Sequence, residues 1–147
     1  MNEIVIDVTK IINFIKGHAL IHREVNSFLE EIDPDLTSLL YYTEVRCLSK
    51  GKMAALFFSR IPELIQFFER FGYSHKFPNL KDKDWILTLA FLVNMYDHLN
   101  CLNLFLQGKN ILFPDAISNI SDFKSKLALY SAQLENYDYS HFENFNK

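Results

Sequence analysis

The sequence has little glycine, proline or cysteine. Its 147 residues include four Gly, four Pro and two Cys. A β-sandwich or β-barrel needs many turns, and turns draw on Gly and Pro, so this scarcity argues against both folds. The two cysteines, Cys47 and Cys101, are too few for the disulfide framework of a small secreted domain. We therefore expect reduced thiols and an intracellular chain.

Long apolar runs are also missing. The longest nearly apolar run extends from Trp85 to Val93, well short of the about 20 residues that a membrane helix needs. Glu3 and Asp7 stand where a signal peptide would have its apolar segment. We expect neither secretion nor a membrane span.

Neither sign of charge dominates. Fifteen basic residues face 18 acidic ones, for a net charge of −3. Nucleic-acid binding depends on clustered Lys and Arg, so the total argues against a strong autonomous DNA-binding protein. The segment 44–83 is locally basic, with eight basic and four acidic side chains.

Apolar and aromatic residues are plentiful. Hydrophobic residues make up 49% of the chain and aromatic residues 15%, with 14 Phe. A chain of this length and composition can bury about two thirds of its unfolded surface in one core. We predict a single domain over 1–147.

The spacing of the apolar residues is helical. They recur at intervals of three and four, which predicts a mainly α fold of about five helices. The expected helices are 2–16, closed by Gly17; 22–32; 49–71, capped by Ser49, kinked or broken at Pro62 and closed by Gly72; 83–107, capped by Asp82 and closed by Gly108; and 114–134. Aromatic and β-branched residues at 39–45 predict one short strand, and the stretch "YSHKFPNLKDKD" (73–84) reads as a polar loop. The domain then divides into a helical N-terminal part (1–38), a junction (39–48), a helical part (49–136) and a tail (137–147).

Residues with catalytic or metal-binding chemistry are scattered. His18 and His22 are four apart, and His98 and Cys101 three apart, but neither pair has the further ligands that zinc requires. We interpret the first pair as surface or boundary residues, and the second as a buried thiol beside a partly buried imidazole. The acidic group around Glu30 is read as a solvated helix end. No phosphate-binding glycine loop and no Gly-x-Ser-x-Gly motif occurs. We predict no catalytic, cofactor or metal residue, and no enzyme.

Two groups of residues are candidates for binding. The first could contact phosphate groups at a helix start, although such charges are also common on solvated helices. It comprises Arg46, Lys50, Lys52, Lys81 and Lys83. The second is an apolar stripe on the long helix that could pack inside the chain or against another chain. It comprises Trp85, Leu89, Leu92, Tyr96, Leu99 and Leu106.

Four stretches resemble a known family. They are "VTKIINFIKGHALIHREVNSFLEEID" (8–33), "LLYYTEVRCLSKGKMAALFFSRIPELIQFF" (39–68), "WILTLAFLVNMYDHLNCLNLFLQGKN" (85–110) and "ISDFKSKLALYSAQLEN" (120–136). Together they resemble part of a hAT-superfamily (hobo/Ac/Tam3) DNA transposase, and above all the vertebrate lineage of zinc-finger BED-domain proteins and general transcription factor II-I repeat domain proteins. The resemblance implies a partial insertion domain of an RNase H-like transposase, which contributes to assembly and DNA contacts in that family.

The resemblance also implies two losses. The three metal-binding acids of the family fall outside the matching stretches, so we expect no DNA cleavage, which needs acids converging on metal ions. In the family a tryptophan follows the arginine that corresponds to Arg46, but here Cys47 stands at that place. A thiol cannot stack on an unpaired base, a contact worth about 1–3 kcal/mol.

The resulting expectation is a non-catalytic, transposase-derived helical module that acts through protein–protein association. Its partner would be a second copy or another helical protein, in the nucleus by resemblance and otherwise in the cytoplasm. One alternative is a weak nucleic-acid-binding module that uses the basic stretch 46–83. Another is a decayed mobile-element fragment without a selected function.

Overall fold

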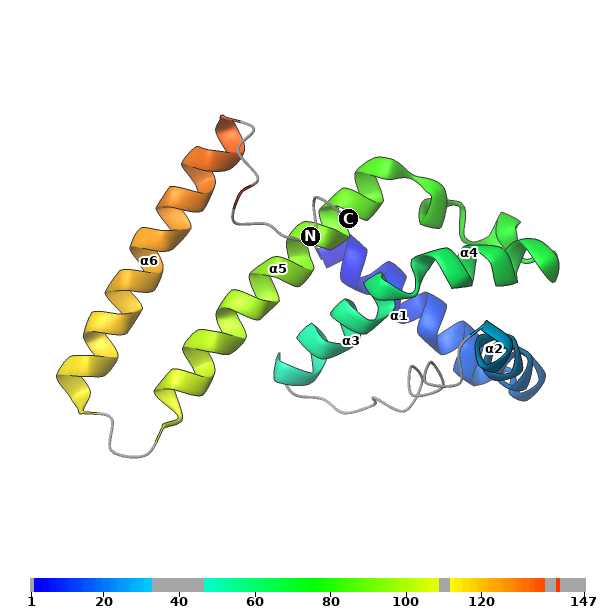
Figure 1. The fold of residues 1–147 in the computed structure, drawn as a ribbon, viewed down its shortest axis with the longest axis horizontal. Coiled ribbons are helices and arrows are strands. Elements are labelled where there is room, and N and C mark those ends of the chain that lie inside the picture. The colour runs from blue at the N-terminus through cyan, green and yellow to red at the C-terminus, as the bar shows by residue number, and fades with distance from the viewer. Residues whose placement is uncertain (1, 33–46, 109–111, 137–139, 141–147) are drawn as a thin grey trace.

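The structure is a computed structural model. It describes residues 2–32, 47–108, 112–136 and 140. Its α-helices are α1 (Asn2–Gly17), α2 (Ala19–Ile32), α3 (Cys47–Ser59), α4 (Ile61–Arg70), α5 (Lys83–Leu106) and α6 (Phe113–Glu135) (Figure 1). No strand occurs in these ranges, which confirms an all-α domain. The strand predicted at 39–45 lies outside the described residues.

The first two helices form an α-helical pair. α1 buries an apolar stripe at the predicted spacing, made of Ile4, Val8, Ile11 and Ile15. The predicted closure by Gly17 in a left-handed conformation is wrong, because Gly17 is the last residue of α1 and Gly72 has the positive φ among the described glycines. α2 begins at Ala19, earlier than predicted, since the amide of His22 already donates to the carbonyl of His18 at 2.9 Å.

Pro62 divides the predicted helix 49–71 into two. α3 ends at Ser59, Arg60 lies between the helices, and Pro62 occupies the first turn of α4. Proline has no amide hydrogen, and the first turn of a helix is where that donor is not needed. The predicted break is therefore confirmed, and the described residues form six α-helices in place of the five expected. The predicted cap at Ser49 is wrong, because α3 already begins at Cys47.

Gly72 ends α4 as predicted. Its φ is +75°, a backbone conformation that side chains with a Cβ rarely adopt. The amide of Tyr73 donates to the carbonyl of Phe68 at 2.8 Å, and the amide of Gly72 to that of Glu69 at 3.3 Å. These two bonds form a Schellman motif, which satisfies the last carbonyls of the helix.

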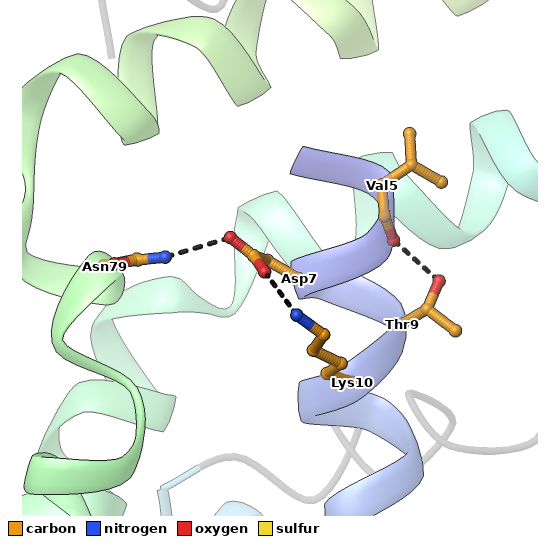
Figure 2. A network of polar contacts seen from close by, with 5 residues as sticks. All are labelled: Val5, Asp7, Thr9, Lys10 and Asn79. Atoms are coloured by element: carbon orange, nitrogen blue, oxygen red, sulfur yellow. Dashed lines mark hydrogen bonds and ion pairs between the residues drawn. The ribbon is translucent and has the colours of Figure 1, made fainter. Parts of the chain in front are cut away.

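The connection from α4 to α5 is ordered by two short 3-10 helices, η2 (Ser74–Lys76) and η3 (Pro78–Lys81). The prediction of a polar loop missed that Leu80 is buried in the core. Figure 2 shows how the turn is tied to α1: the Asn79 Nδ2 donates to the Asp7 carboxylate at 2.9 Å, and Lys10 approaches the same carboxylate at 3.3 Å. These contacts fix the turn to α1 shortly before α5 begins at Lys83.

α5 lies between α6 and the other helices (Figure 1). Asp82 caps it as predicted, because its Oδ1 accepts from the amide of Asp84 at 3.0 Å. At the other end α5 closes near Gly108, whose amide donates to the carbonyl of Phe105. The main core cluster takes residues from α1 to α5 and from η3, and includes no described residue of α6. α6 runs antiparallel to α5 at the edge of the molecule (Figure 1).

Candidate interaction surface

The predicted basic group is only partly described. Lys52, Lys81 and Lys83 are exposed on α3, on η3 and at the start of α5. Arg46 lies outside the described residues. Lys50 belongs to α3, but its side chain is not among those described.

The described basic residues do not form one group, because Lys52 lies apart from the other two. A Cβ added to Gly51 would lie 3.0 Å from the Cβ of Tyr96, so the neighbouring Lys52 is level with the second half of α5. Lys83 is the first residue of α5, about 20 Å from Tyr96 at 1.5 Å per residue. Lys81 is paired with Glu69, with 2.7 Å between the Nζ and a carboxylate oxygen. Lys52 therefore lies apart from Lys81 and Lys83, which are two residues apart at the start of α5.

The predicted apolar stripe on α5 divides into two parts. Trp85, Leu89 and Leu92 are buried in the core of this chain, where α3 packs against α5. For these three residues the seam lies inside the chain, and their assignment to an association face is corrected, because they have no surface left for a partner. Leu99 is 43% exposed. Tyr96 and Leu106 are half-buried.

α6 presents a second apolar stripe, which is distinct from the side facing α5. Its residues are Phe113, Ile117, Ile120 and Leu127, exposed by 78%, 52%, 40% and 36%. At 3.6 residues per turn these four side chains fall in a sector of about 80°. The one described residue of α6 that is buried is Tyr130, whose ring stacks on His98 with 4.8 Å between centroids. The stripe is thus separate from the side that faces α5.

One set of exposed apolar residues from both helices lies on one side of the α5–α6 hairpin, whereas Leu104 and Leu129, exposed by 62% and 49%, lie elsewhere on the two helices. On α5, Leu99 and Leu106 are rotated about the helix axis by roughly a quarter of a turn from the residues facing α6, in the sense in which the chain winds. On α6, the stripe is rotated about the helix axis by about a third of a turn from the residues facing α5, also in the sense in which the chain winds. Because the two helices are antiparallel (Figure 1), similar rotations in the same sense about their axes place both stripes on the same side of the hairpin. We call this surface the hairpin face. It comprises Met95, Leu99, Leu106, Phe113, Ile117, Ile120 and Leu127.

A cleft of about 470 Å³ lies between α5 and α6, lined by His98, Cys101 and Asp122 among others. Cys101 is exposed, so the prediction of a buried thiol is wrong at this position. His98 is half-buried, as expected. Across the described ranges, no group of three or more His, Cys, Asp and Glu side chains could hold a metal ion.

A wider groove of about 650 Å³ lies between α3, α4 and α5. Its lining is mostly apolar, with Phe58, Ile65 and Ile86 among the residues and Asp97 as its charged member. None of the described helices is both long enough and apolar enough to cross a bilayer.

The elements define a class: an all-α domain in which a helical core carries a projecting hairpin. The chain belongs to the FAM200/GTF2IRD2 helical domain family, whose model matches residues 1–135. It is 37% identical over 142 residues to the general transcription factor II-I repeat domain-containing protein 2 of Bos taurus, and 34% identical over 142 residues to that of Mus musculus. Each match covers 97% of this chain and 15% of the relative. No solved structure matches this chain.

Sequence reasoning missed the exposed half of α6 for an identifiable reason. The helix carries two apolar stripes about a quarter of a turn apart, and a single helical period fitted to the sequence includes members of both. Phe123 and Tyr130 face α5, whereas Ile120 and Leu127 do not. Fitting two sectors in place of one to residues 113–135 would have separated them.

Proposed function

We propose that this domain is a non-catalytic helical module that works through protein–protein association, and that the hairpin face is its contact surface. The observation that carries the proposal is the exposure of large apolar side chains on one side of two adjacent helices. Monomeric proteins rarely expose contiguous apolar patches larger than a few hundred Å², and larger ones mark interaction sites.

We also propose that the domain descends from the insertion domain of a hAT-superfamily transposase and works in the nucleus. The descent rests on the four quoted stretches, which place the family's metal-binding acids outside the matched segments. The location rests on the name of its relatives, which are general transcription factor II-I repeat domain-containing proteins. A metal-dependent DNA-strand cleavage assay tests the absence of catalysis, and reproducible cleavage by the purified chain would contradict it.

Capture from nuclear extract tests association. The immobilised chain is compared with an Ile117→Glu/Ile120→Glu double variant, which puts two charges on the hairpin face, and with Leu129→Glu as matched control. Leu129 is 49% exposed on the same helix, but roughly half a turn away from the face. We expect proteins that bind the wild type and the control and not the double variant. Equal capture by all three would refute the role of the face.

The salt dependence of binding separates this function from nucleic-acid binding. Contacts made by apolar burial change little between 50 and 500 mM salt, whereas each phosphate contact with duplex DNA adds about −0.9 to the slope of log K against log salt. A steep loss of DNA affinity with salt, weakened in a Lys52→Ala variant, would favour the nucleic-acid alternative. If neither proteins nor nucleic acid bind, the decayed fragment remains.

A further inference from the structure

We infer that the occupant of the hairpin face is a second copy of this chain, so that two α5–α6 hairpins close into a four-helix bundle. This inference rests on the proposed function and adds the identity of the partner. Pairing of the same surface on both copies would be isologous, the form of contact in two-fold symmetric dimers. Helical hairpins that pack face to face in this way give the common four-helix architecture.

The size of the face suits a dimer. Taking about 200 Å² for a fully exposed large apolar residue, the exposed members of the face contribute on the order of 500 Å² of apolar surface. These are Leu99, Phe113, Ile117, Ile120 and Leu127. Interfaces are about 60% apolar, so this amount corresponds to roughly 800 Å² per partner, the size of a standard specific interface.

The chemistry of the face suits a copy of itself. Of the four charged residues between Phe113 and Leu127, only Lys124 lies in the sector of the exposed stripe. Its long apolar stem can cover neighbouring side chains while its ammonium stays in water. A partner chosen by charge would require opposite charges on this surface. A nearly neutral apolar face is complemented by another of the same kind.

The weak anchoring of α6 points the same way. Its 23 residues bury one described side chain fully, Tyr130, whereas most of the stability of a protein helix comes from packing of an amphipathic face. Packing against a second hairpin supplies the burial that the core of this chain does not give it. A second copy is the partner that every sample of the pure protein contains.

The test is the mass of the purified chain by sedimentation velocity and light scattering from about 1 to 100 μM. The monomer has a mass of 17.3 kDa, and we expect twice that mass for the wild type and for Leu129→Glu. The Ile117→Glu/Ile120→Glu variant should be monomeric, with a dissociation constant raised at least 100-fold, because it would bury charges in an apolar contact. The milder Ile120→Ser should raise it about 10-fold, and helix content by circular dichroism identifies any variant that fails to fold.

Two results would overturn the inference. One is a wild type that stays monomeric at 100 μM, and the other is a dimer that persists in both variants with their helix content intact. Comparison with the capture experiment separates the two proposals. A monomer that still captures another protein through the hairpin face disproves the second copy and leaves the proposed function standing, whereas a monomer that captures nothing disproves both.

Discussion

Gly51 is the position where α3 and α5 approach most closely among the described glycines. A Cβ added to Gly51 would lie 2.9 Å from the Nδ2 of Asn100 and 3.0 Å from the Cβ of Tyr96. The Asn100 amide is the far end of a flexible side chain and can turn away. The Tyr96 Cβ is fixed to its helix, so the two helices must separate by a few tenths of an ångström. We therefore predict that Gly51→Ala destabilises the domain.

The size of this effect follows from two opposing contributions. Overpacking a helix contact typically costs about 1–3 kcal/mol. Replacing Gly by Ala inside a helix gains about 1 kcal/mol through helix propensity. The net loss for Gly51→Ala should thus be about 1 kcal/mol, a fall in Tm of roughly 2–4 °C for a chain of this size.

Gly17 provides the matched control. It is also helical, but a Cβ added there meets nothing within 4 Å. Gly17→Ala should therefore be neutral or stabilising by up to about 1 kcal/mol. Urea unfolding of both variants isolates the overpacking cost, because most of the propensity gain cancels in the difference. Equal stabilisation by both substitutions would show that α3 and α5 do not approach as described.

Three further substitutions and one titration test other parts of the fold. Leu89→Ala should cost about 2–5 kcal/mol by chemical unfolding because this side chain is fully buried, whereas Leu87→Ala, at a half-exposed position of the same helix, should stay within about 0.5 kcal/mol; similar losses would contradict the orientation of α5. Gly72→Ala should cost about 1–2 kcal/mol at the left-handed closure of α4, and a neutral result would remove that constraint. Asp82→Ala should cost about 1 kcal/mol through loss of the α5 cap, with Asp82→Asn retaining most of it. Burial lowers the pKa of Lys16 from its usual 10.5, so just below pH 10.5 the folded state has released a proton that the unfolded state still binds. The free energy of unfolding should therefore rise with pH in this range. Alkaline unfolding curves of Lys16→Met should lose that rise.

The periodicity of apolar residues was sufficient to predict most of the helices. The start of α5 was predictable from Asp82 and the end of α4 from Gly72, because both residues act through their own local backbone chemistry. The break at Pro62 was predictable for the same reason. The start of α3 was not, since Ser49 carries a capping side chain but the helix extends beyond it to Cys47. Local signals predict where a helix can begin, and packing decides whether it begins earlier.

The candidate surface was harder to predict, because it depends on which side of each helix the rest of the chain covers. The stripe from Trp85 to Leu106 is continuous in sequence, yet α3 covers its first half and leaves Leu99 exposed. Likewise, nothing in the spacing of Lys52 and Lys83 reveals that about half the length of α5 separates them. Such relations depend on long-range contacts, which a pattern along one chain does not contain.

The single tryptophan of the chain is a consequence of this layout that an experimenter can use. Trp85 lies in the main cluster and not on the hairpin face, so its emission reports on melting of the central body. Far-ultraviolet ellipticity sums over every helix, α6 included. A difference between the two melting temperatures would therefore measure how independently α6 unfolds from the core.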